Sequence, residues 1–307
     1  MNISKGSIVS DTPIQIIHPQ PKHIASLRIL WKEAFGDTDA FLDVFFSTAF
    51  APERCLCILI KNNITAALYW FECEYSNHPL AYIYAVATAK AYRGRGLCRQ
   101  LLAATHSTLT QQGYIGALLV PGNETLFDFY KKAGYQTTCY RHIYQYNQNA
   151  GVAYASTMNQ AFLASHTGHA QSISDTSTFL VKQISATEYA SLRKNFLPPD
   201  SVFQEKETIA FLQTQLKFYS GENFLAAVAI TEQKLYCPEL LYTDTIVSSK
   251  NIRSGNSINH DLMSQLLSYF GCINGIFCSP GGNSPFAMYY SLNTTIKAPK
   301  YFAFAFD

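Results

Sequence analysis

The 307-residue sequence lacks the features that mark three large classes of protein. No apolar run approaches the roughly 18 to 20 residues that a membrane-spanning helix needs, and the N-terminus has no apolar stretch of the kind found in secretion signals. Excess charge is also missing: the formal net charge is +2, and the 23 basic residues are scattered along the chain. We therefore expect a cytoplasmic protein that binds neither nucleic acid nor a membrane.

Cysteine is present, but not at the spacings that metal sites and disulfide frameworks use. Only Cys55 and Cys57 of the eight cysteines lie close together, and no CxxC or paired Cys/His cluster occurs. We expect reduced thiols and no metal site. The length of the chain and its content of 48% hydrophobic residues predict two domains of ordinary size, each with a substantial core.

Four short segments recur in the same order along the chain, which indicates a tandem duplication. The matches pair residues 25–28 with 190–193, 38–42 with 208–212, 63–67 with 223–227, and 116–130 with 275–289, at offsets of 159 to 170 residues. The last match aligns Tyr130 with Tyr289. The sequence thus predicts a first domain at 1–147, a Ser-, Thr- and Gln-rich linker at 148–177, and a second domain at 178–307.

In the first copy, the spacing of apolar residues predicts alternating strands and helices. Strands are expected at 14–18, 54–61, 64–75, 80–88, 114–120 and 137–146. Helices are expected at 21–35 and 39–50, from Leu97 to a stop at Gly113, and after an Asn123 cap.

A basic glycine loop at 87–97 joins a predicted strand to a predicted helix. Gly94 and Gly96 let the backbone approach a ligand, and amide groups converge at the positive end of the helix. With charge from Arg93 and Arg95, such a loop can bind a pyrophosphate. The same residues also fit a tight strand-to-helix turn or an RGG-type nucleic-acid segment.

This stretch, with a second segment after it, resembles the Gcn5-related N-acetyltransferase (GNAT) superfamily. That family has a loop Q/R-x-x-G-x-G/A and, further along, N-x6-Y-x3-G-F/Y. The second pattern is matched with correct spacing by Asn123, Tyr130, Gly134 and Tyr135. The loop fits at Gly94 and Gly96, with Ala91 where Gln or Arg is usual and Cys98 where a small residue is usual. The resemblance covers about residues 14–146, and the tandem arrangement is similar to N-myristoyltransferase and the Eis-type acetyltransferases.

The resemblance implies an α/β (α+β) fold of two tandem GNAT-like domains, each a mixed, mostly antiparallel sheet flanked by helices. It implies an N-acyltransferase that moves an acetyl or other short acyl group from acetyl-CoA (acyl-CoA) to an amine of a small molecule or peptide, by direct attack in a ternary complex. The residues implied to bind the cosubstrate are Val86, Ala87, Thr88, Arg93, Gly94, Arg95, Gly96, Leu97, Cys98 and Asn123.

Two catalytic roles follow from the resemblance. A backbone N–H near 86–88 would hold the thioester oxyanion, and Tyr130 would protonate the departing thiolate. From spacing alone, Tyr130 also fits a core aromatic residue, and Cys98 is interpreted as packing. The second copy offers only Arg253-Ser254-Gly255 within 244–259, so we expect a degenerate domain in which Tyr289 packs the core.

The general base and the activity itself stay open at this stage. Glu72 and Glu74 lie two apart on a predicted strand and hence on one face, where either could act directly or through water, although a solvated strand face is an equal interpretation. In the tandem acyltransferases that this chain resembles, the C-terminal carboxylate, here of Asp307, is the base. The alternative function is a non-catalytic acyl-CoA-binding regulatory or scaffolding protein.

Overall fold

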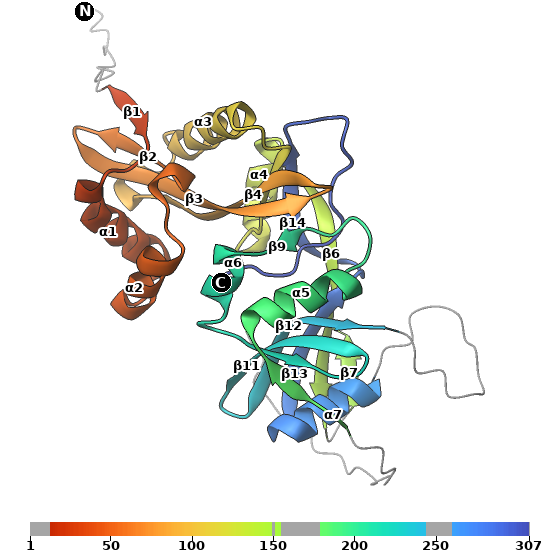
Figure 1. The fold of residues 1–307 in the computed structure, drawn as a ribbon. Helices are drawn as coiled ribbons and strands as arrows, with labels where there is room; N and C mark the ends of the chain where they lie inside the picture. Colours follow the sequence, from red (N-terminus) through yellow and green to blue (C-terminus); the bar gives the residue numbers. More distant parts are fainter. Residues whose placement is uncertain (1–12, 149–150, 155–178, 244–259, 307) are drawn as a thin grey trace, which may run out of the picture. The chain divides into compact units, whose positions relative to one another are not determined.

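The chain divides into two units, and two strands of one hairpin, β3 (Asn63–Tyr75) and β4 (His78–Thr88), contribute residues to both. Unit 1 consists of Met1–Phe71 and Ile83–Gly113, and unit 2 consists of Glu72–Tyr82 and Tyr114–Asp307. The computed structural model describes residues 13–148, 151–154, 179–243 and 260–306 (Figure 1).

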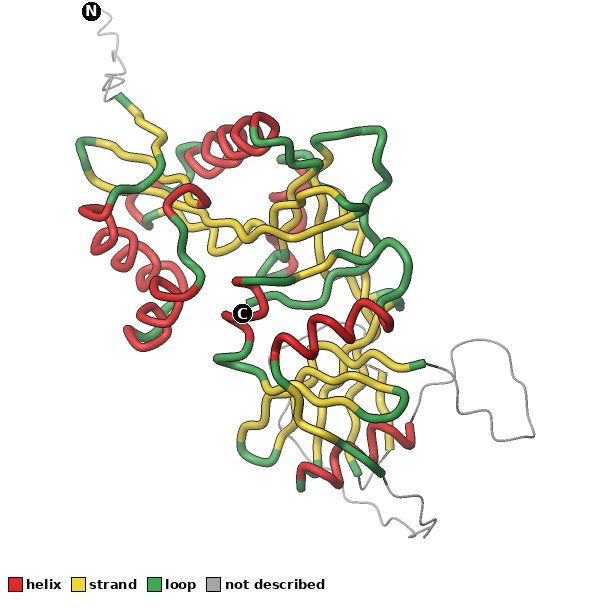
Figure 2. Tube along the Cα trace, viewed as in Figure 1, coloured by secondary structure: helices red, strands yellow, loops and turns green. Residues whose placement is uncertain are grey.

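Unit 1 is a small antiparallel sheet with helices on its two faces (Figures 1 and 2). Its strand order is β1-β2-β3-β4, where β1 is Ile14–Ile17 and β2 is Cys55–Ile60. The helices are α1 (Ile24–Phe35), α2 (Asp39–Thr48) and α3 (Leu97–Gln111), and short 3-10 turns cover Pro21–His23, Pro52–Arg54 and Lys90–Tyr92. Thr38 caps α2 by accepting a hydrogen bond from the amide of Phe41.

Aromatic packing fills the space between the sheet and helices α1 and α2. The indole of Trp31 has ring centroids within 4.6–5.5 Å of three other rings, those of Phe45, Tyr69 and Tyr84. Phe71 lies 5.7 Å from Tyr84 and extends the same group. We call these five residues the Trp31 cluster. Their rings meet at tilted or edge-on angles, as aromatic quadrupoles prefer.

Unit 2 contains a longer sheet in the order β4-β5-β14-β6-β13-β12-β11-β10-β8. The strands are β5 (Gly116–Leu119), β6 (Gln136–Asn147), β8 (Lys182–Ile184), β10 (Lys217–Ser220), β11 (Phe224–Thr231), β12 (Lys234–Tyr242), β13 (Asn274–Pro280) and β14 (Ser284–Ser291). The pairs β4–β5 and β12–β13 are parallel, and the others with a printed register are antiparallel. Two short strands lie off this path: β7 (Gly151–Tyr154) pairs with β6, and β9 (Phe203–Gln204) pairs with β3.

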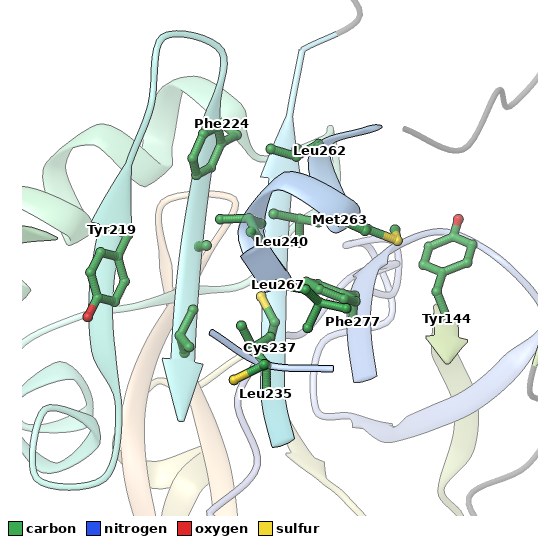
Figure 3. Packing of buried hydrophobic residues seen from close by; sticks show 14 residues of the cluster. Tyr144, Tyr219, Phe224, Leu235, Cys237, Leu240, Leu262, Met263, Leu267 and Phe277 are labelled. Atoms are coloured by element: carbon green, nitrogen blue, oxygen red, sulfur yellow. The ribbon is translucent and has the colours of Figure 1, made fainter. Parts of the chain in front are cut away.

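The helices of unit 2 are α4 (Glu124–Lys132), α5 (Ala186–Phe196), α6 (Glu207–Leu212) and α7 (His260–Phe270). Neighbouring residues of β10 show that α5 and α7 cover opposite faces of the sheet. Phe218 stacks on Tyr189 of α5 at 4.4 Å, while Tyr219 lies 4.8 Å from Phe270 of α7. Figure 3 shows the core on the α7 side, where leucines and a methionine of α7 pack on strands β10 to β13.

The strand order supports the tandem duplication. The series β1-β2-β3-β4 that leads to β5 is repeated as β8-β10-β11-β12 leading to β13. Strand β14 of the second copy, however, lies between β5 and β6 of the first copy. The two copies therefore complete each other's sheets rather than closing separately. The predicted boundaries 1–147 and 178–307 stay predictions.

Two expectations from the sequence need correction or lie outside the described residues. Tyr130 and Tyr289 match in sequence, but Tyr130 lies on helix α4 and Tyr289 on strand β14. A hairpin follows β13 directly, without a helix like α4, so the two tyrosines are not structurally equivalent. As predicted, Tyr289 is buried, and a Cβ on Gly116 would overlap its ring. The predicted loop remnant at 244–259 lies outside the described residues.

Candidate functional site

The glycine loop lies in unit 1, between β4 and α3. Gly94 has φ = 76° and Gly96 has φ = 77°, a region of backbone space that L-residues with a Cβ rarely adopt. A Cβ built on either glycine would meet no atom within 4 Å. The backbone conformation therefore requires glycine at both positions, and the space above them is open to a ligand.

Unpaired amides accumulate at this loop. Within the described ranges, no acceptor is bonded to the amides of Gly94, Arg95 and Gly96. The first-turn amides of α3, which begins at Leu97, add further donors because they have no intrahelical acceptor. Several N–H groups at the positive end of a helix form an anion-binding site.

The two arginines of the loop fold back onto its carbonyl groups. Arg93 donates from Nε to the carbonyl of Thr88 at 3.0 Å, and Arg95 donates from Nη2 to the carbonyl of Ala91 at 3.0 Å. The Arg95 guanidinium also lies 5.0 Å from the ring centroid of Tyr92. These contacts stiffen the loop and leave positive charge at its exposed rim.

The start of the loop is held by two further hydrogen bonds. The amide of Ala89 donates to the carbonyl of Thr65 in β3 at 2.9 Å. The amide of Lys90 donates to Oε1 of Glu33 in α1 at 2.6 Å. The loop is thus fixed to both the sheet and a helix, which reduces the ordering cost of binding an anion.

Strand β4 carries an irregularity immediately before the residues predicted to face a thioester. Ala85 has φ = 48°, an uncommon value for a non-glycine residue and one typical of a bulge. Val86 and Thr88 follow it half-buried, and Ala87 is buried. A positive φ turns the backbone away from the direction of a regular strand, so the conformation of Ala85 affects the direction of the amides at these three residues.

Asn123 and Tyr130 lie in unit 2, the first as the N-cap of helix α4 and the second within that helix. The Oδ1 atom of Asn123 accepts from the amide of Leu126 at 3.2 Å and from the hydroxyl of Thr125 at 2.7 Å, which is the predicted cap. Tyr130 is 7% exposed, and its ring lies 5.8 Å from Tyr135. This burial fits both a core residue and a proton donor within a closed site.

The thiol of Cys98 is unsuited to nucleophilic work. Burial raises its pKa to about 11, although the nearby charge of Arg99 lowers it in part. At neutral pH the side chain is therefore a protonated thiol, and only a thiolate is a strong nucleophile. This supports the interpretation of Cys98 as a packing residue.

The two candidate bases on β3 line a cavity of unit 2 with a volume of about 230 Å³. Glu72 is held there by two partners: its Oε1 pairs with Nζ of Lys206 at 3.2 Å, and its Oε2 accepts from the hydroxyl of Tyr114 at 3.2 Å. Glu74 also lines the cavity and is exposed. Sequence reasoning missed Lys206, because no local signal links it to a strand 134 residues away.

The structure brings the predicted site residues together in two groups. Val86 to Thr88 and Arg93 to Cys98 lie in unit 1, while Asn123, the N-cap of α4, and Tyr130, within α4, lie in unit 2. Asp307 lies outside the described residues. Across the described ranges, no group of three or more His, Cys, Asp or Glu side chains is placed to hold a metal ion. No helix in those ranges is both long enough and apolar enough to cross a membrane.

Residues 15–138 match the family model of the acetyltransferase (GNAT) domain. No curated protein matches the chain. Among solved structures, a GCN5-related N-acetyltransferase from Anabaena variabilis is similar with a TM-score of 0.65 and 12% identity, covering 92% of this chain and 73% of that one. One from Kribbella flavida has a TM-score of 0.63 at 12% identity, covering 92% and 72%. Eis1 from Mycobacterium abscessus has a TM-score of 0.59 at 10% identity, covering 91% and 73%. Identities this low establish the fold alone.

Proposed function

We propose that this protein, whose residues 15–138 match the GNAT acetyltransferase domain, transfers an acetyl or other short acyl group from acyl-CoA to an amine. Acyl transfer from CoA is the general activity of that domain. The observation that carries the proposal is the loop at Gly94 and Gly96, where unpaired amides and open space meet at the start of α3. A pyrophosphate fits this arrangement because its oxygens accept from the amides while Arg93 and Arg95 balance its charge.

In the proposed reaction, the amine attacks the thioester carbon, the C–N bond forms, and the C–S bond breaks. Backbone amides among Val86 to Thr88, which follow the positive φ of Ala85, stabilise the negative charge that develops on the carbonyl oxygen. Tyr130 donates a proton to the leaving sulfur. No covalent intermediate on the protein is required.

The proton that leaves the attacking amine needs an acceptor. Glu72 and Glu74 are the candidates among the described residues, acting directly or through water. The C-terminal carboxylate, which the resemblance to tandem acyltransferases implies, belongs to a residue outside the described range. We propose a small-molecule or peptide amine as the acceptor.

The alternative is a protein that binds acyl-CoA without turning it over. Both candidates predict binding, and only the enzyme predicts release of free CoA when an amine is added. A panel of primary amines with acetyl-CoA, monitored by a thiol reagent, separates the two.

A thermal-shift experiment with acetyl-CoA tests the binding site. A ligand that binds only the folded state at 100 times its Kd stabilises it by about 2.7 kcal/mol, so acetyl-CoA is expected to raise the Tm of the wild-type protein. Gly94→Glu and Gly96→Glu each place bulk and negative charge where the pyrophosphate would lie, and we expect both to abolish the shift.

Gly113→Glu is the matched control. Gly113 has φ = 80° and nothing within 4 Å of a built Cβ, so the substitution carries the same backbone strain outside the loop. This variant should keep the full shift relative to its own apo Tm. If acetyl-CoA raises the Tm of the two loop variants as much as it raises the Tm of Gly113→Glu, the loop assignment is wrong.

A further inference from the structure

A fully buried carboxylate lies inside the second copy, surrounded by hydrogen-bond donors. Glu239 of β12 has no exposed surface. Its Oε2 accepts from Nε of Arg193 at 2.6 Å and from the hydroxyl of Tyr189 at 2.6 Å. Its Oε1 accepts from Nη2 of Arg193 at 2.9 Å and from the hydroxyl of Tyr301 at 3.0 Å. We call these four residues the Glu239 cluster.

Tyr301 is the first residue of a buried segment, Tyr301–Phe306, that has no regular secondary structure. A glutamine holds the middle of this segment as a neighbouring strand would. Gln204 donates from Nε2 to the carbonyl of Phe304 at 3.0 Å and accepts at Oε1 from the Phe304 amide at 3.1 Å. The segment is thus fixed at both Tyr301 and Phe304.

The held segment packs on a tyrosine of β4. Tyr82 has ring centroids 4.8 Å from Phe302 and 5.6 Å from Phe306, and its hydroxyl oxygen accepts from the Phe306 amide at 3.4 Å. Tyr82 is also a residue at which β4 pairs with β5, opposite Leu118. Ala85, with its positive φ of 48°, follows three residues further along the same strand.

We propose that Glu239 and Tyr301 are positioning residues for the acyl transfer proposed above. Through the Tyr301 hydroxyl, the Glu239 cluster holds segment Tyr301–Phe306 against Tyr82. This fixes the direction in which β4 leaves its pairing with β5, and hence the direction of the amides that follow Ala85. In this way, residues of the second copy would set the catalytic geometry of the first copy.

The Glu239 cluster contains a matched pair that isolates this role. Tyr301→Phe and Tyr189→Phe each remove one hydroxyl that donates to the same buried carboxylate. Tyr189 belongs to helix α5, and its ring, whose centroid lies 6.4 Å from that of Phe304, is kept in Tyr189→Phe, so this variant loses only the hydroxyl that bonds Glu239. Both variants should lower the Tm by similar amounts, which makes each one the stability control for the other.

Hydrogen exchange is the first measurement, because it requires no acceptor. We expect the amides of β4 and of Tyr301–Phe306 to exchange faster in Tyr301→Phe than in Tyr189→Phe, when each variant is measured the same number of degrees below its own Tm. Equal exchange in the two variants would overturn the proposal.

Kinetics are the second measurement, with acetyl-CoA and the panel amine that gives the fastest CoA release. Tyr301→Phe should lower kcat about tenfold or more while the KM for acetyl-CoA stays unchanged, because misplaced donors cost rate rather than binding. Tyr189→Phe should retain the kcat of the wild-type protein, and equal kcat values in the two variants would overturn the proposal. If the wild-type protein releases no CoA with any amine, the proposed function fails, and the exchange comparison still decides whether the Glu239 cluster orients β4.

Discussion

Tyr84 of β4 and Glu239 of β12 occupy corresponding places in the two copies. Each lies two residues beyond a parallel pair, Tyr82 with Leu118 in the first copy and Cys237 with Phe277 in the second. The ring of Tyr84 contacts other aromatic rings of the Trp31 cluster. Around Glu239 they are an ion pair and two phenols.

The difference shows how one backbone layout accepts two kinds of interior. Aromatic packing depends on shape and volume, so it tolerates substitutions of similar size. A buried carboxylate tolerates almost none, because each lost donor leaves part of its charge without a partner. At this position the second copy thus has directional hydrogen bonds that specify where Tyr301 must lie, while the first copy has aromatic packing that depends on volume and shape.

The largest effect that separates the copies is expected at their sequence-matched tyrosines. Tyr130→Phe should lower turnover by about 10²- to 10⁴-fold with little change in acetyl-CoA binding, because the leaving sulfur loses its proton donor. Tyr289→Phe removes only the hydrogen bond from its hydroxyl to the carbonyl of Ile115, so kcat should be unchanged. Steady-state kinetics at saturating acetyl-CoA compare the two, and equal losses of kcat would return Tyr130 to a packing role.

A second contrast lies at two arginines that the sequence repeats align. Arg193→Met leaves Glu239 buried without its cation and should cost about 3–5 kcal/mol of unfolding free energy. Arg28 pairs with Asp39 and Asp43 near the surface, at 3.1 and 2.8 Å. Arg28→Met should leave the urea midpoint within the scatter of wild-type replicates. Similar midpoint losses in both variants would show that burial is not what distinguishes the copies.

The smallest expected effect is a pH dependence that belongs to the first copy. Burial lowers the pKa of His106 on α3 to about 4, so the side chain is neutral in the folded protein at pH 5. The unfolded chain takes up a proton below its ordinary pKa of about 6.5, which lowers stability as pH falls from 6.5 to 4. The loss at pH 5 should be about 1–2 kcal/mol.

Urea titrations at pH 7.5 and pH 5 measure this loss, and His106→Gln should remove that share of it. Arg193, Tyr189 and Tyr301 have raised pKa values and hold their protons throughout this range. They therefore add nothing to the acid sensitivity. An unchanged pH dependence in His106→Gln would contradict the assignment.

Features that depend on short-range signals could be predicted from the sequence. Asn123 caps α4 because its short side chain reaches an amide three residues on, and Gly113 follows α3 because φ = 80° favours glycine. The glycine loop was found for the same reason. Each of these depends on residues that are neighbours in the chain.

Features that depend on distant pairings could not be predicted. The donors to Glu239 come from 46 to 62 residues away, and nothing near Glu239 in the sequence marks it as buried. The positive φ of Ala85 could not be predicted from the residue type either, because alanine rarely adopts one. The match between Tyr130 and Tyr289 was misleading, because identical residues at the same spacing do not show that the second copy lacks a helix between β13 and β14.

The place of β14 makes the duplication difficult to undo. In the first copy, β5 and β6 are not neighbours, and the strand that joins them comes from more than 130 residues later in the chain. The ring of Tyr289 occupies the space that a side chain at position 116 would need. A gene fragment encoding only the first copy would leave the edge of β5 that faces β14 and both long edges of β6, toward β14 and β13, without their partners, and open edges of this kind promote aggregation. Once the strands had been exchanged, neither copy could be removed without leaving strands of the other copy unpaired.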